Sequence, residues 1–247
     1  MIRPVALLAA AALVAGLPSG AAADTAGDPS TEVGALRAAG TVRLDGVTVR
    51  LRAGTSQVVT VNRTRGYRAR VTYWVRRDGR WVAKRRSTDG RIGYGGLVAA
   101  SKRKQSTGTT PLGTFTMTEA FGIRAKPRGT QLPYRKVRRG DYWVQDNRSA
   151  HYNTLRSKSA GGFRWWLPSS HRNASERLRD YRKQYVWSVV VDFNRPPGAV
   201  RYRGSGIFLH ANGRGATAGC VSVPAAFIRF VVKHLRKEKQ SVIAIGR

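Results

Sequence analysis

The feature that most constrains the fold is a series of short runs, from Thr41 onward, in which apolar and polar residues alternate around turn residues. Two Asp-Gly pairs, Asp45–Gly46 and Asp78–Gly79, each lie between such runs. Alternation with a period of two is typical of half-buried strands, and Asp-Gly tolerates the positive φ of a tight hairpin turn. The sequence therefore predicts two hairpins, with strands at 42–44, 47–51, 71–75 and 80–83.

Further strand-like runs and only two helix signals complete this pattern. Asn173 followed by Glu176 resembles a capping box and predicts a helix to about Lys183, and Pro224 suits the first turn of a helix to about Lys237. The other predicted strands are 58–61, 97–99, 114–118, 187–193, 207–210 and 242–245. We expect a mainly β fold with few helices, and the 247 residues, 41% of them hydrophobic, suffice for a large buried core.

The N-terminus has the three parts of a secretory signal peptide. Arg3 precedes an apolar run over 5–17, and Ala21–Ala23 forms a small-residue cleavage site. The apolar run is shorter than the roughly 20 residues that span a bilayer, and no later stretch is long and apolar enough to do so. We therefore expect residues 1–23 to be removed on export, which leaves a secreted or cell-wall-associated protein without a transmembrane span.

The formal net charge of +32 points to polyanionic partners. Basic runs at Ser101–Lys104 and Arg135–Arg139 are the visible patches, and Trp165, Trp166 and Tyr181 could stack on nucleic-acid bases. For an exported protein, anionic cell-wall polymers and the free carboxylates of peptidoglycan are the favoured partners, and nucleic acid is the less favoured alternative.

Cys220 is the single cysteine, which excludes an internal disulfide and a zinc site built on several thiolates. The four histidines lack the close spacing of metal ligands, so no metal is expected. His210 ends a predicted strand ten residues before Cys220, and Gly219 permits a sharp turn at the thiol. An imidazole beside a thiol is the arrangement of cysteine nucleophiles, whereas the alternative is an inert buried cysteine near a core histidine.

Two ordered motifs resemble the L,D-transpeptidase catalytic domain family. The family's Thr-Pro-x-Gly-x-Phe element is matched by Thr110–Phe115, and its Ser/Thr-x-Gly-Cys motif, with a histidine upstream, is matched by Thr217–Cys220 with His210. The resemblance covers about residue 56 to the C-terminus and implies a curved mixed β-sheet with an active-site cleft. Residues 24–55 then form a flexible segment plus the first hairpin, which is either a small appendage or an addition to the sheet.

By this resemblance, Cys220 is the nucleophile and His210 the general base and acid. The Ala211 carbonyl orients the imidazole, Gly219 and Cys220 supply oxyanion donors, and substrate contacts fall at Thr217, Ala218 and Ser222. The sequence departs from the family in three places. The loop between histidine and cysteine is short, Ala218 replaces a frequent second histidine, and Ser222 stands where Asn or Arg is common.

The resemblance implies attack on a peptidoglycan tetrapeptide stem at the carbonyl of the third residue. A thioester forms, the terminal D-Ala leaves, and an amine of a neighbouring stem completes a 3→3 cross-link without metal or nucleotide cofactor. Two alternatives stay open. One is a hydrolase on the same scaffold, an L,D-carboxypeptidase or a stem-cleaving amidase, and the other is a non-catalytic basic protein that binds cell wall or nucleic acid.

Overall fold

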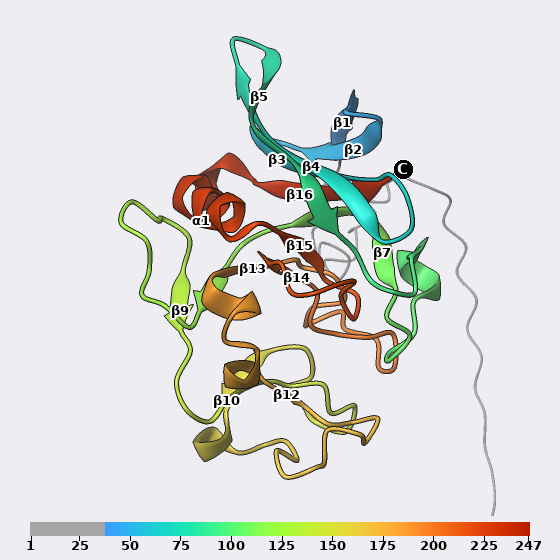
Figure 1. Cartoon of the computed structure of the whole chain (residues 1–247), viewed down its shortest axis with the longest axis vertical. Coiled ribbons are helices and arrows are strands. Elements are labelled where there is room, and N and C mark those ends of the chain that lie inside the picture. Colours follow the sequence, from blue (N-terminus) through green and yellow to red (C-terminus); the bar gives the residue numbers. More distant parts are fainter. Residues whose placement is uncertain (1–37) are drawn as a thin grey trace, which may run out of the picture. The chain divides into compact units, whose positions relative to one another are not determined.

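A computed structural model describes residues 38–247 of the chain, and side chains from Gly40 onward. The predicted signal peptide, residues 1–23, and residues 24–37 lie outside the described residues. The predicted mainly β fold with few helices is confirmed (Figure 1).

Sixteen strands and one α-helix make up the described part of the chain. The N-terminal strands are β1 (Ala38–Leu44), β2 (Val47–Arg52), β3 (Gln57–Arg63), β4 (Arg68–Arg77), β5 (Arg80–Arg91), β6 (Leu97–Ala99), β7 (Thr110–Thr116) and β8 (Ala120–Gly122). The C-terminal strands are β9 (Tyr134–Lys136), β10 (Asp141–Trp143), β11 (Leu155–Ser157), β12 (Glu176–Arg177), β13 (Ser188–Val190), β14 (Phe208–Ala211), β15 (Val221–Val223) and β16 (Val242–Gly246). The helix α1 spans Ala225–His234, and the short 3-10 helices are η1 (Ala100–Lys102), η2 (Lys158–Ala160), η3 (Leu178–Tyr181), η4 (Gln184–Val186) and η5 (Lys237–Lys239).

Eleven of these strands form one mixed sheet in the order β6-β7-β16-β3-β4-β5-β15-β14-β13-β8-β9. The C-terminal strand β16 lies between β3, to which it is parallel, and β7, to which it is antiparallel. Near the middle of the sheet, β14 and β15 pair in parallel, and β13 pairs antiparallel with β14. The strands that hold His210 and the residues after Cys220 are therefore hydrogen-bonded neighbours.

Both Asp-Gly hairpins are confirmed, because Asp45 and Asp78 have φ of 51° and 49° and each is followed by a glycine of positive φ. The first hairpin, β1–β2, forms a two-stranded sheet of its own and does not add a strand to the large sheet. Its buried Val47 and Val49 pack with Val58 and Val242. This cluster anchors the hairpin on strands β3 and β16.

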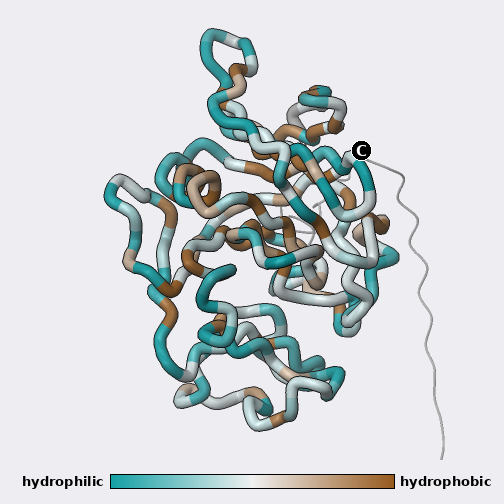
Figure 2. The backbone as a smooth tube through the Cα atoms, viewed as in Figure 1, coloured by the Kyte–Doolittle hydropathy of each residue, from teal (hydrophilic) through white to brown (hydrophobic). Residues whose placement is uncertain are grey.

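Helix α1 covers one face of the large sheet. Its buried side chains, Phe227, Ile228, Val231 and Val232, join the apolar residues of β3, β14, β15 and β16 in the main core. Apolar, brown segments run through the middle of the fold, where these elements lie, whereas the tip of the β4–β5 hairpin is hydrophilic (Figure 2). The helix follows Pro224 as predicted but ends at His234, because Leu235 takes an extended ψ of 141°.

The predicted helix over 173–183 is wrong. The segment instead contains the short strand β12, which pairs with β10 in a three-stranded sheet with β11, followed by η3. Asn173 does not cap a helix, because its Oδ1 accepts a 2.8 Å hydrogen bond from the side chain of Asn147. Glu176 bonds to Tyr185 and Gln145, so tertiary contacts replace the capping box.

Candidate active site

A cleft of about 1040 Å³ contains both members of the predicted Cys–His pair. Its lining comes from residues distant in sequence, including Arg103, Gln145, Glu176, Tyr185, Gly206, His210, Thr217 and Cys220. A cleft of this size can enclose a short peptide, since small-molecule sites are commonly of about 300–1,000 Å³.

The parallel pairing of β14 with β15 brings His210 and Cys220 to the same cleft. His210 lies opposite Ser222, Cys220 comes directly before the first residue of β15, and both His210 and Cys220 line the cleft. The intervening Leu209 and Val221 project to the opposite face and pack in the main core. Alternation therefore separates a structural face from a face that borders the cleft.

The Cys220 thiol is 8% exposed and hydrogen-bonded to backbone groups. Sγ donates to the Gly206 carbonyl at 3.2 Å and accepts from the Phe208 N–H at 3.4 Å. Within residues 38–247, no hydrogen bond joins this thiol to the His210 ring. Burial, and after it the negative charge of Glu176, raises the pKa of Cys220 to about 12, so the thiol is protonated at neutral pH.

The His210 ring is held in one orientation by its own strand. Nδ1 lies 2.7 Å from the Ala211 carbonyl oxygen, and because a carbonyl only accepts, Nδ1 carries the proton and Nε2 keeps its lone pair. Tyr185 packs edge-on against the ring at 5.3 Å between centroids. Burial lowers the pKa of His210 to about 4, so the imidazole is neutral and can accept a proton at pH 7.

The turn before the thiol is fixed by both sequence motifs. Gly219 has a φ of +129°, which favours glycine, and its N–H donates to Thr217 Oγ1 at 3.2 Å. Thr217 Oγ1 donates in turn to the Cys220 carbonyl at 2.6 Å. From the other motif, Thr110 Oγ1 donates to the Gly219 carbonyl at 2.8 Å and accepts from the Gly93 N–H at 2.8 Å. Thr110 thus ties the upstream motif to the turn that carries the thiol.

The three predicted substrate-contact residues have different positions. Thr217 and Ala218 line the cleft, and Ala218 is exposed. Ser222 is fully buried and is not part of the cleft lining; its hydroxyl donates to Asn212 Oδ1 at 2.7 Å. Contact of these residues with a substrate stays a prediction.

Among the cleft residues that the sequence did not reveal are Glu176 and Arg103. Glu176 lines the cleft, where burial raises its pKa to about 7 and Tyr185 donates to it at 2.5 Å. Arg103, assigned to a surface patch from the basic run Ser101–Lys104, is only 5% exposed and also lines the cleft. Only the capping-box pattern marked Glu176, and it pointed to the wrong structure, whereas nothing in the sequence distinguishes Arg103 from its exposed neighbours.

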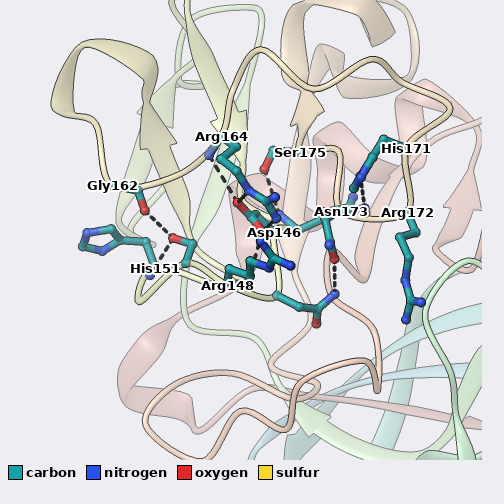
Figure 3. Close-up of polar contacts among 12 residues, drawn as sticks. Asp146, Arg148, His151, Gly162, Arg164, His171, Arg172, Asn173 and Ser175 are labelled. Carbon is teal, nitrogen blue, oxygen red and sulfur yellow. Dashed lines mark hydrogen bonds and ion pairs between the residues drawn. The ribbon is translucent and has the colours of Figure 1, made fainter.

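The cleft wall that carries Gln145 and Glu176 is braced by a polar loop network (Figure 3). The Arg164 guanidinium forks onto the buried Asp146 carboxylate at 2.6 and 2.8 Å and holds the pKa of Asp146 at about 2. His171 Nδ1 accepts from the Asn173 N–H at 3.0 Å.

In the described part of the chain, no group of three or more His, Cys, Asp or Glu residues could hold a metal ion.

The fold and the cleft define a mainly β domain that brings one thiol and one neutral imidazole to a peptide-sized cavity. The family model of the L,D-transpeptidase catalytic domain (YkuD) matches residues 56–243, and the chain belongs to this family. None of the helices in residues 38–247 is long and apolar enough to cross a membrane.

Two solved structures are similar over most of this chain. They are Bd1075 of Bdellovibrio bacteriovorus, at 15% identity and a TM-score of 0.38, and the K307A mutant of the helical cell shape determining protein Pgp2 of Campylobacter jejuni, at 14% identity and a TM-score of 0.38. The alignments cover 78% and 77% of this chain but only 48% and 46% of those proteins, so the chain spans about half their length. No curated protein sequence matches the chain significantly.

Proposed function

We propose that this protein is an exported cysteine L,D-transpeptidase that acylates Cys220 with a peptidoglycan stem and transfers the acyl group to an amine. The observation that carries the proposal is the pairing, in one cleft, of a single thiol with an imidazole whose Nε2 is free to accept a proton. The bond from Thr110 to the Gly219 carbonyl supports it further, because it gives the upstream motif a direct role in shaping the nucleophile turn.

Acylation begins when Cys220 Sγ attacks the carbonyl carbon of the third stem residue. The thiol proton passes to His210 Nε2, a carbon–sulfur bond forms, and the bond to the nitrogen of D-Ala breaks. The imidazolium then protonates the leaving amine, which departs as D-Ala and leaves a thioester. The Ala211 carbonyl stabilises the imidazolium, since Nδ1–H continues to donate to it.

The proton moves during attack and not before it. With the pKa of Cys220 at about 12 and that of His210 at about 4, the resting pair is a neutral thiol and a neutral imidazole. The thiol proton is engaged with the Gly206 carbonyl and must turn to His210 when a substrate enters. His210 therefore acts as a general base on a thiol, and no thiolate–imidazolium pair is stored in the empty site.

The oxyanion of the tetrahedral intermediate requires donors at the turn. The Gly219 N–H, which donates to Thr217 Oγ1 in the empty site, switches its hydrogen bond to the oxyanion. The Cys220 N–H, on the adjoining peptide, is the second donor. The Thr217 hydroxyl keeps its bond to the Cys220 carbonyl, so the turn is retained through the exchange.

The thioester is resolved by an acceptor. A side-chain amine of a second stem gives a 3→3 cross-link, and water gives the trimmed tripeptide of a carboxypeptidase. A net charge of +32 supports retention at anionic wall polymers after export and agrees with stems that carry free carboxylates. No metal or nucleotide enters the reaction.

The test is incubation of the mature protein with purified tetrapeptide-containing muropeptides, followed by mass spectrometry of the products. We expect free D-Ala and 3→3-linked dimers with wild-type protein and with Ser159→Ala, an exposed control outside the cleft, and neither product with Cys220→Ser. Tripeptides without dimers would show that the protein is a carboxypeptidase and not a transpeptidase. Wild-type activity in Cys220→Ser would overturn the mechanism.

A further inference from the structure

Arg103 is an unusual residue for a protein interior. It is 5% exposed, although arginine is rarely fully buried unless it is paired with an acid. Within residues 38–247 it forms no salt bridge with a carboxylate. Its hydrogen bonds go to two backbone carbonyls, from Nε to Thr109 at 2.8 Å and from Nη1 to Arg203 at 3.2 Å, and the guanidinium also lies over the Phe193 ring.

The backbone around this guanidinium leaves space for it. A Cβ on Gly204 would lie 1.6 Å from Nη1, and a Cβ on Gly219 would lie 2.9 Å from Nη2. Both glycines have positive φ, at +101° and +129°. The charged end of Arg103 therefore fills the space beside the peptide that immediately precedes Cys220.

Burial of an uncompensated guanidinium costs several kcal/mol, so a partner anion is expected in some state of the protein. The ionisable groups whose charges act on Arg103 are the thiol of Cys220 and the phenol of Tyr152. Burial also raises the pKa of Tyr152, so that phenol stays neutral. The thiol is the group that loses its proton in the proposed reaction.

We propose that Arg103 stabilises the negative charge that forms at Cys220 during attack, as a positioning residue that acts on the nucleophile. This proposal rests on the proposed function, in which the Cys220 proton passes to His210 Nε2 during attack and negative charge develops on Sγ. Arg103 opposes Glu176, whose negative charge lies on the same cleft and disfavours that thiolate. The positive charge of Arg103 thus promotes ionisation of the thiol, and the negative charge of Glu176 opposes it.

The experiment is the rate of alkylation of Cys220, the single cysteine, by iodoacetamide between pH 7 and 9, followed by intact mass. It requires no peptidoglycan, so its outcome is independent of whether cross-links form. Four variants are compared with wild type: Arg103→Met, Arg103→Gln, Arg103→Lys and Arg156→Met. Arg156 is the matched control, because it also bonds only backbone carbonyls, those of Ala160 and Gly161, and does not line the cleft.

An opposite charge near a thiol lowers its pKa by about one unit or more. A rise of one unit in the pKa of the thiol lowers the fraction of thiolate about tenfold but makes each thiolate more nucleophilic, so the alkylation rate falls by roughly threefold. We expect both neutral variants at position 103 to react at least about threefold more slowly than wild type, and Arg103→Lys and Arg156→Met to stay within about twofold. Near-UV circular dichroism checks the folding of each variant. If Arg103→Met does not fold, Arg103→Gln, which keeps a donor for the Thr109 carbonyl, is the neutral variant that is compared with wild type.

Two results would overturn the proposal. If Arg103→Lys were as slow as Arg103→Gln, the fork of hydrogen bonds and not the charge would matter, and Arg103 would be structural. If the neutral variants slowed only iodoacetate, which carries a carboxylate, and left iodoacetamide unchanged, Arg103 would be a site for a carboxylate of the substrate instead.

Discussion

The Thr110 hydroxyl offers a quantitative test of how the Gly219–Cys220 turn is held. It is fully buried and makes two backbone hydrogen bonds, one to the Gly219 carbonyl and one from the Gly93 N–H. Thr110→Val keeps the shape of the side chain but leaves both backbone groups without a partner. Since each unsatisfied buried group costs about 1–3 kcal/mol, we expect a loss of about 3 kcal/mol in the free energy of unfolding.

For a domain of this size, that loss lowers Tm by about 6–12 °C. Urea unfolding followed by tryptophan fluorescence measures the free energy, and acylation of Cys220 is expected to slow by roughly tenfold or more because the turn moves. Thr64→Val is the matched control, since its exposed hydroxyl bonds only the Arg68 carbonyl, and it should change stability by less than about 0.5 kcal/mol. Equal effects of the two substitutions would show that the Thr110 hydroxyl does not hold the Gly219–Cys220 turn.

Three further predictions concern ionisable groups. Asp146→Asn should lose about 2 kcal/mol of stability at pH 7, because Arg164 holds the pKa of Asp146 at about 2; in urea titrations, the gap to wild type should close as pH falls from 4 through 2. Because burial keeps the folded pKa of His210 at about 4, wild type should lose about 3 kcal/mol of stability as pH falls from 6.5 to 4, and His210→Gln should not show this loss. The difference between the two proteins isolates the effect of His210, because Glu176 titrates in the same range with the opposite sign. Glu176→Gln should speed alkylation of Cys220 at pH 8, and an unchanged or lower rate would show that the Glu176 charge does not act on the thiol.

Local signals predicted the fold where a short stretch of sequence decides the structure. The Asp-Gly pairs determine their hairpins because few residues accept positive φ, and Pro224 marks the start of α1 because its fixed φ suits a helix start. The apolar run Ile207–Leu209 predicted β14, which delivers His210 at its end, and the parallel pairing of β14 with β15 brings the residue before β15, Cys220, to the same cleft. The strand pattern and the motif together therefore predicted that His210 and Cys220 come close to one another.

Tertiary contacts decided the rest. The capping-box pattern at Asn173 failed because its amide bonds Asn147 and the Glu176 carboxylate bonds Tyr185, both outside the predicted helix. Arg103 was assigned to the surface because its neighbours are basic, yet the chain turns its guanidinium inward between two glycines that lie about 100 residues further on. No local pattern encodes contacts over such a separation.

The most direct test of the central claim is intact-protein mass spectrometry after exposure to a carbapenem, an acylating β-lactam. We expect a single covalent adduct on wild-type protein, none on Cys220→Ser, and a strongly slowed reaction in His210→Ala, because Nε2 would no longer accept the thiol proton. An unmodified wild-type protein whose thiol also resists iodoacetamide would show that Cys220 is not a nucleophile and would identify it as a structural cysteine of a wall-binding protein.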